Sequence, residues 1–82
     1  MSLNKQIKLF ILKNYLFTED ESILADGDSL MQKGIIDSTG LLELVSHIEE
    51  TYRLSVAPEE MVPENLDSVS QIAQFIERKK AA

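Results

Sequence analysis

Cysteine and tryptophan are absent from the 82 residues, and aromatic residues make up only 6% of the chain. Without thiols the chain can form no disulfide framework, no thiolate metal site and no cysteine nucleophile, which suits a cytoplasmic protein. Long apolar runs are also missing. None approaches the roughly 18 residues that cross a bilayer, so we predict no membrane span. The polar start Met1-Ser2-Leu3-Asn4-Lys5 lacks the pattern of a signal peptide.

Histidine, glycine and proline are scarce as well, with one, three and two residues. His47 has no second histidine or cysteine to complete a zinc site and no partner for a nucleophilic relay. We therefore expect it at the surface or at the edge of the core. Because no convincing carboxylate pair accompanies it, we predict no catalytic residues and no bound metal. The hydrophobic content of 44% is enough for one core, and residues 1–82 are predicted to form a single domain.

Basic residues are outnumbered by acidic ones, and the net charge of −6 argues against nucleic acid as a partner because its phosphates would repel the chain. The charge is unevenly distributed. Residues 1–17 contain three lysines and no acid, whereas the stretch from Asp37 to Asp67 contains eight acids and a single base, Arg53. Two interpretations stay open: a solvated helix face, or an electrostatic guide toward basic surfaces of partner proteins.

Three segments carry the spacing of amphipathic helices. Their inner faces are predicted to be Leu3, Ile7, Phe10, Ile11 and Tyr15 in residues 3–17; Leu41, Leu44, Val45, Ile48 and Tyr52 in residues 38–53; and Val69, Ile72, Ala73 and Ile76 in a last helix. Ser68 and Gln71 form a capping-box pattern at the start of the last helix. Since no alternating strand pattern occurs, the sequence predicts an all-α protein, a small four-helix bundle with one short helix.

The connections between these helices are also patterned. Residues 18–36 are rich in acids and turn-forming residues and predict a long loop, which apolar side chains would hold against the core. The candidates for this role are Ile23, Leu24, Leu30, Met31 and Ile35. Further along, Pro58 followed by two glutamates predicts the start of the short helix, and Pro63 is expected to interrupt it.

Asp37 and Ser38 stand where the second long helix begins, and both are residue types that cap helix N-termini. A helix N-terminus carries partial positive charge and free N–H groups, so it favours a bound or attached anion. A phosphate ester on an exposed Ser38 hydroxyl would lie in this favourable field. Taken alone, however, the residue types favour a simpler interpretation, in which Ser38 only caps the helix.

The stretch Gly34-Ile35-Ile36-Asp37-Ser38, followed by Leu41-Leu42-Glu43-Leu44-Val45 and Ile48-Glu49-Glu50-Thr51-Tyr52, resembles the modification site of acyl and peptidyl carrier proteins. The spacing of the flanking helices extends the resemblance over nearly the whole chain. It implies a bundle of acyl-carrier type, with three longer helices, a short third helix and a long loop between the first two. It also implies that Ser38, beside Asp37, receives 4′-phosphopantetheine from coenzyme A and carries acyl or aminoacyl groups as thioesters.

The same resemblance implies a phosphopantetheinyl transferase, an acyl- or aminoacyl-adenylating ligase and acyltransferase or synthase enzymes as partners. The docking residues would be Thr39, Leu42, Glu43, Glu49, Glu50, Met61 and Val62. Thr39-Gly40 departs from the leucine that follows the serine in many fatty-acid carriers, which favours a carrier paired with a dedicated adenylating ligase in specialised metabolism over a housekeeping fatty-acid carrier. Fatty-acid, polyketide and nonribosomal-type biosynthesis all stay open. The chain length favours a free-standing carrier, which we expect to be a monomer. The alternative is a small acidic helical interaction module in which Ser38 is only a helix cap.

Overall fold

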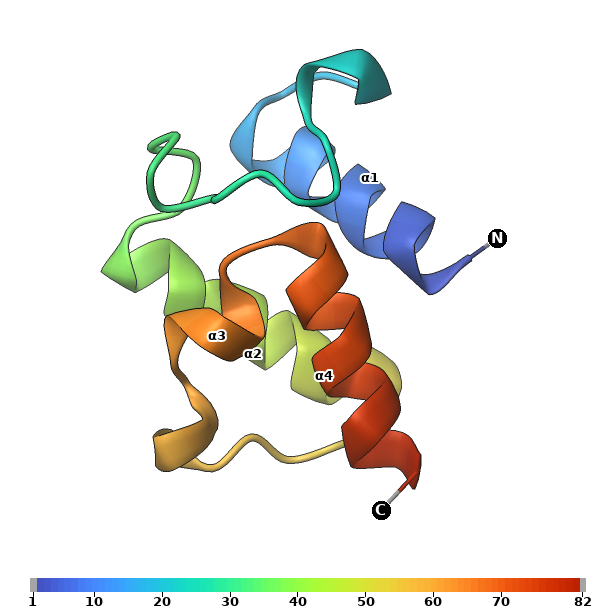
Figure 1. The fold of residues 1–82 in the computed structure, drawn as a ribbon, viewed down its shortest axis with the longest axis vertical. Helices are drawn as coiled ribbons and strands as arrows, with labels where there is room; N and C mark the ends of the chain where they lie inside the picture. The colour runs from blue at the N-terminus through green and yellow to red at the C-terminus, as the bar shows by residue number, and fades with distance from the viewer. Residues whose placement is uncertain (1, 82) are drawn as a thin grey trace.

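The computed structural model describes residues 2–81, which contain helices and loops but no strand (Figure 1). The long helices are α1 (Leu3–Tyr15), α2 (Ser38–Tyr52) and α4 (Val69–Ala81), and the short one is α3 (Pro63–Leu66). Single turns of 3₁₀ helix occur at Glu21–Ile23 and Pro58–Glu60. In Figure 1, α2 passes behind α3 and α4, while the long loop after α1 lies across the top of the bundle. The predicted all-α bundle of acyl-carrier type is confirmed.

The long helices begin where predicted and end slightly earlier. At the start of α1 the Ser2 hydroxyl accepts a hydrogen bond from the backbone N–H of Lys5 at 3.2 Å. Phe17, the predicted last residue of this helix, has a φ of 54° and lies beyond the end of α1. Arg53, the predicted end of the next helix, has a φ of 55° and follows α2. A left-handed residue directly after a helix lets the following N–H groups bond to its last carbonyls.

The short helix begins at Pro63. This corrects the prediction that it would begin at Pro58 and be interrupted at Pro63. Pro58 begins only a 3₁₀ turn, and Pro63 is the first residue of α3. Proline suits the first helical position, because its fixed φ is already helical and its missing N–H would have no partner there. The predicted length of a turn or two is confirmed, since α3 has four residues.

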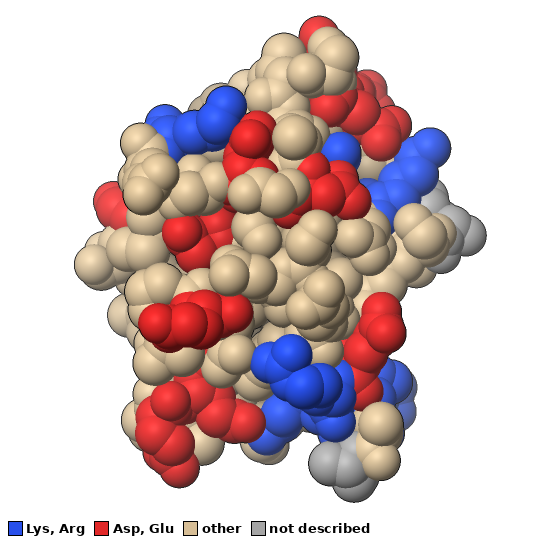
Figure 2. All heavy atoms as spheres, viewed as in Figure 1, with Lys and Arg blue, Asp and Glu red and all other residues tan. Residues whose placement is uncertain are grey.

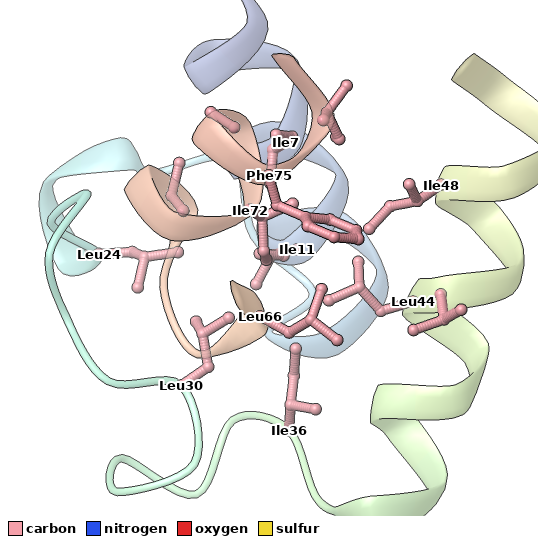
Figure 3. Packing of buried hydrophobic residues seen from close by; sticks show 14 of the residues in the cluster. Ile7, Ile11, Leu24, Leu30, Ile36, Leu44, Ile48, Leu66, Ile72 and Phe75 are labelled. Atoms are coloured by element: carbon pink, nitrogen blue, oxygen red, sulfur yellow. The ribbon is translucent and has the colours of Figure 1, made fainter. Parts of the chain in front are cut away.

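The core is formed by one face of each helix together with three side chains of the long loop (Figure 3). Figure 3 shows Ile7 and Ile11 of α1, Leu44 and Ile48 of α2 and Ile72 and Phe75 of α4 directed into a common interior. Ile11, Leu30 and Ile72 are fully buried. Burying such side chains stabilises the fold by about 1.5–3 kcal/mol each, which is how a chain without disulfides holds together.

The long loop is held by Leu24 and Leu30, as predicted, and by Ile36. Ile23 and Met31 are 49% and 42% exposed, so the prediction that they would pin the loop is wrong. They lie in a 3₁₀ turn and a hydrogen-bonded turn, whose tight curvature directs neighbouring side chains to opposite sides. The predicted half-burial of Ile35 against the core is found.

Asp67, between α3 and α4, holds the loop by its polar groups. Its carboxylate accepts hydrogen bonds from the Ser29 hydroxyl at 2.5 Å and from the backbone N–H of Met31 at 2.9 Å. Its carbonyl accepts from the Leu30 N–H at 2.8 Å. The Leu30 carbonyl in turn accepts from the N–H groups of Ile35 and Ile36. The segment that leads into α2 is thereby fixed against the junction between α3 and α4.

Helices α1 and α2 meet along what we call the α1–α2 seam, defined by three side-chain contacts. The Tyr15 hydroxyl donates to the Gly40 carbonyl at 3.0 Å. The Phe10 and His47 rings stack with their centroids 3.6 Å apart. The Tyr52 hydroxyl donates to the Gln6 side-chain oxygen at 3.2 Å. In these three contacts, partners earlier in α1 lie against partners later in α2, so the two helices run antiparallel.

No helix within residues 2–81 is both long enough and apolar enough to cross a membrane.

Candidate functional site

Asp37, and not Ser38, caps α2. The Asp37 side chain accepts a hydrogen bond from the backbone N–H of Gly40 at 2.7 Å, and its carbonyl accepts from the N–H of Leu41 at 2.8 Å. Its backbone is extended, as expected of a residue that precedes a helix. The interpretation in which Ser38 only caps the helix is therefore wrong, because Ser38 already lies inside α2.

Ser38 is the first helical residue, and its side chain is exposed. Over residues 2–81 no hydrogen bond involves its hydroxyl, and the backbone N–H groups of Ser38 and Thr39 bond to no other group of the protein. These N–H groups form part of the positive end of the helix. The site thus offers a free nucleophilic oxygen beside two free donors, an arrangement suited to a phosphate ester.

A surface hollow of about 310 Å³ adjoins Ser38. It is lined by Tyr15, Gly34, Ile35, Asp37, Thr39, Gly40 and Glu43, among which are both chain neighbours of Ser38. Gly34 has a φ of 70°, a left-handed conformation that glycine adopts without strain. Burial raises the pKa of the Tyr15 hydroxyl, and the charges of Glu43 and Asp37 add to this effect, so Tyr15 stays protonated and can donate its hydrogen bond.

Gly40 is buried at this hollow, where α1 crosses the first turn of α2. A Cβ atom at position 40 would lie 3.3 Å from an Asp37 carboxylate oxygen, 3.3 Å from a Tyr15 ring carbon and 3.4 Å from an Ile36 methyl. Glycine at position 40 thus permits the close approach of the Tyr15 ring. Sequence reasoning missed the role of Tyr15, which was predicted only as a residue of the inner face.

Several predicted docking residues form one exposed stripe on α2. Thr39, Leu42, Glu43 and Glu50 are all exposed, with Leu42 at 57%, and helical spacing puts them on one side together with Ser46. Ser46 was not among the predicted docking residues, although its spacing from Thr39 and Glu43 places it there.

The other predicted docking residues are placed differently. Glu49 is half-buried and accepts a hydrogen bond from the backbone N–H of Val56 at 2.9 Å, so it helps to hold the segment after α2. Met61 and Val62 are half-buried and lie directly before α3. Met61 packs against the core. These three side chains present less surface to a partner than the α2 stripe does.

The glutamates of the α2 stripe are not paired with lysine or arginine side chains of the described residues. Lysine side chains pair with Glu19, Glu21, Asp26, Asp28 and Glu60, but among the described residues neither Glu43 nor Glu50 forms an ion pair. Figure 2 shows acidic side chains spread over most of one face and basic side chains in separate groups, one of which lies near the C-terminal end of α4. The three lysines of α1 are thus paired with acids of the loop, whereas Glu43 and Glu50 of the α2 stripe carry charges without such a partner in the described part of the chain.

Comparison with curated proteins identifies relatives of similar length. The chain is 31% identical over 65 residues to a D-alanyl carrier protein of Abiotrophia defectiva, covering 78% of this chain and 82% of the relative. It is 34% identical over 67 residues to a D-alanyl carrier protein of Streptococcus pyogenes, covering 82% and 84%. No family model matches the chain. With its acyl-carrier type of bundle and this similarity over four-fifths of its length, the chain belongs to the acyl and peptidyl carrier protein family, as a specialised carrier related to the D-alanyl carrier proteins.

Proposed function

We propose that this protein carries an aminoacyl group as a thioester on a 4′-phosphopantetheine arm attached to Ser38. The observation that carries the proposal is the state of the Ser38 hydroxyl, which is exposed and free of hydrogen bonds at the first residue of α2 while Asp37 caps the helix. A serine needed only for capping would have its oxygen engaged with the first-turn N–H groups.

The residues around Ser38 fit such an arm. The free N–H groups of Ser38 and Thr39 can donate hydrogen bonds to the oxygens of a phosphodiester at the positive end of α2, and the adjoining hollow leaves room for the first part of the arm. In the attachment step the Ser38 oxygen would form a bond to the pantetheine-side phosphorus of coenzyme A. The bond from this phosphorus to the nucleotide phosphate would break, and the hydroxyl proton would pass to a base of the transferase. Asp37 would help to organise the metal and phosphate there.

An aminoacyl cargo is favoured by the relatives, which are named D-alanyl carrier proteins. Such a cargo would be activated by an aminoacyl-adenylating ligase and captured by the thiol of the arm, which supplies the thioester chemistry. The protein itself would contribute recognition and positioning. A monomeric state, a location in the cytoplasm and the further acyltransferase or synthase partners stay predictions.

Partner enzymes would dock on the α2 stripe of Thr39, Leu42, Glu43, Ser46 and Glu50. Leu42 offers an exposed apolar side chain, and the unpaired glutamates favour basic partner surfaces. Because the stripe begins next to Ser38, a partner bound there would have the root of the arm at the edge of its interface.

The test is the intact mass before and after incubation with coenzyme A and a broad-specificity phosphopantetheinyl transferase. We expect a gain of one phosphopantetheinyl group, lost in Ser38→Ala and kept in Ser55→Ala, which changes an exposed serine outside α2 and its docking stripe. A folded protein that gains no mass, or a Ser38→Ala variant that still does, would contradict the proposal.

The cargo is tested on the modified protein with a D-alanine-adenylating ligase, ATP and D-alanine, with fatty acyl donors in parallel. The proposal expects a hydroxylamine-sensitive aminoacyl adduct and no fatty acyl adduct. The reverse outcome would keep Ser38 as the attachment site but replace the cargo.

A further inference from the structure

The outer side of the α1–α2 seam contains a hollow of about 360 Å³, which we call the seam groove. Its lining residues are Gln6, Leu9, Phe10, Lys13, Asn14, His47, Thr51 and Tyr52. All of them belong to α1 or α2, and none of them lines the hollow beside Ser38. The groove is therefore a separate surface feature, formed by two antiparallel helices.

The floor of the groove is apolar. Phe10 stacks on the His47 ring at an interplanar angle of 10°, and Leu9 and Phe10 are half-buried against the core. Burial lowers the pKa of His47, so the imidazole is neutral at neutral pH and adds no charge to the floor. Such a surface suits the apolar side of a binding partner.

The α2 edge of the groove carries unpaired negative charge. Glu43 lies four residues before His47 and Glu50 three residues after it, so helical spacing makes both carboxylates neighbours of the His47 ring. The charge of Glu50 opposes the fall that burial causes in the pKa of His47. Neither glutamate forms an ion pair within residues 2–81, whereas Lys13, on the α1 side, is paired with Glu19. The groove is thus complementary to a cationic partner.

The walls of the groove decide which form of partner segment fits. The backbone groups in the middle of α1 and α2 are bonded within their own helices, so they offer no hydrogen bonds to an extended peptide. A helix satisfies its own backbone groups, and its side chains can pack between those of two neighbouring helices. The α1 wall from Gln6 to Asn14 is about 12 Å long, which corresponds to about two helical turns.

We propose that the seam groove binds a short, basic amphipathic helix of a partner protein. The apolar side of this helix would lie on Leu9, Phe10 and His47, and its lysine or arginine side chains would lie beside Glu43 and Glu50. The inference goes beyond the proposed function, because neither Ser38 nor a group attached to it takes part in this contact.

A second copy of this chain does not supply such a helix. Its basic helical segment is the end of α4, where Lys79 pairs with Glu60 and the Lys80 ammonium donates to the Tyr52 carbonyl. The apolar side of α4, which includes Ile72 and Ile76, is buried in the core. The occupant is therefore a different protein.

The test uses a synthetic peptide of about 15 residues, which is long enough to form a helix. Its leucines are spaced to share one helical side, and its other residues are lysine, arginine and alanine. A second peptide has the same composition in an order that spreads the leucines around the helix. Each is titrated into the unmodified chain and followed by NMR. We expect the first peptide to shift signals of Leu9, Phe10, His47 and Thr51, and the second to bind about tenfold more weakly.

Matched variants locate the contact. Glu43→Gln with Glu50→Gln removes the charges at the groove, and Glu59→Gln with Glu64→Gln removes two charges from exposed residues elsewhere. We expect the Kd for the first peptide to rise about five- to tenfold at low salt in the first pair, with little change in the second.

A further matched pair places a cation in the groove or outside it. Thr51→Arg should weaken binding of the first peptide about tenfold, and Ser55→Arg, an exposed position outside the lining, should not. Equal affinity for the two peptides, equal losses within either matched pair, or shifts centred on Met61 and Val62 would overturn the inference. Such results would leave the carrier function intact. Conversely, a chain that gains no phosphopantetheinyl group should still bind the first peptide, and so should Ser38→Ala.

Discussion

At the scale of single residues, Asp37 caps α2, while Ser38 presents an exposed hydroxyl. Asp37 caps the first turn of α2 through its bond to the Gly40 N–H, and within residues 2–81 the exposed Ser38 hydroxyl forms no hydrogen bond. Since the cap does not depend on Ser38, the proposed attachment of a group there would remove no hydrogen bond from the helix.

The roles of Asp37 can be separated by substitution. Asp37→Ala should lower the free energy of unfolding by about 1 kcal/mol, because the Gly40 N–H loses its partner. Asp37→Asn should keep most of this stability, since asparagine caps equally well, but should slow modification of Ser38 if the carboxylate organises the transferase site. Urea unfolding and initial rates of mass gain measure the two effects. Equal rates for Asp37→Asn and the wild type would limit Asp37 to capping.

His47 gives the fold a specific pH dependence. Burial lowers its pKa from the ordinary value of 6.5, so the unfolded chain takes up a proton at higher pH than the folded one. Stability is therefore complete above pH 6.5 and decreases as the pH falls toward the folded pKa. We expect the urea midpoint to fall between about pH 7.5 and about pH 5.5, and the fall to shrink in His47→Gln. If the urea midpoint of His47→Gln fell with pH as steeply as that of the wild type, groups other than His47 would cause the pH dependence.

At the scale of elements, α1 and α2 are joined by the contact of Tyr15 with Gly40. The ring packs where a Cβ would crowd it, and the hydroxyl donates to the Gly40 carbonyl. The atoms around this Cβ position cannot all recede, because Asp37 is held by its cap bond and Tyr15 by its hydrogen bond. This joint fixes the end of α1 against the turn that presents Ser38.

Gly40→Ala tests the joint. Alanine gains about 1 kcal/mol in helix propensity over glycine, but crowding costs about 1–3 kcal/mol, so we expect a net loss of about 1 kcal/mol. The loss should disappear in a Tyr15→Ala background, where the Cβ finds space. Chemical denaturation of the two single variants and the double variant measures this coupling. A stabilising Gly40→Ala in the wild-type background would show that Tyr15 moves aside freely.

A second junction between elements is held by Asp67, which binds Ser29 and Met31 through its carboxylate. Asp67→Ala should destabilise the protein by about 2–3 kcal/mol, since hydrogen bonds to a charged group are lost together and the Met31 N–H is left without this acceptor. Hydrogen exchange should accelerate most at Leu30, Met31 and Ile35. An exchange increase spread evenly over all helices would instead indicate global destabilisation without local opening of the loop.

At the scale of the whole molecule, the charges are sorted into two regions. The lysines of α1 pair with acids of the loop, whereas Glu43 and Glu50 of α2 form no ion pair within residues 2–81. These two glutamates therefore leave unpaired negative charge on the surface where we propose that partners dock. A field of this kind raises association rates with basic surfaces and is weakened by salt.

Two charge-reversal pairs test this field. Glu43→Lys with Glu50→Lys changes the α2 stripe, and Glu64→Lys with Glu77→Lys makes the same change in net charge on exposed residues of α3 and α4. We expect kcat/KM for Ser38 modification to fall about tenfold at low salt in the first pair, with little change in the second. High salt should reduce the difference in kcat/KM between the two pairs of variants. Equal losses in both pairs would mean that only the net charge matters.

The sequence alone determined the helices and the position of the candidate site, since both depend on local patterns. Apolar spacing identified most of the inner faces of α1, α2 and α4, although Leu12 and Phe75 lay outside the predicted faces and are buried. The Ser68 hydroxyl caps α4 by accepting a hydrogen bond from the Gln71 N–H at 3.1 Å. The Asp37-Ser38 pair likewise predicted the start of α2 from the sequence, because capping residues act within one turn of their own position.

Tertiary structure decided what depends on residues far apart in the chain. Only the folded structure shows that Asp37 rather than Ser38 is the cap, that α3 begins at Pro63 and that Ile23 and Met31 are exposed. The contact of Tyr15 with Gly40 and the stacking of Phe10 on His47 join residues 25 and 37 positions apart, and no local pattern encodes them. The surface hollow lined by Phe10, His47 and Thr51 likewise exists only because these contacts bring α1 and α2 together.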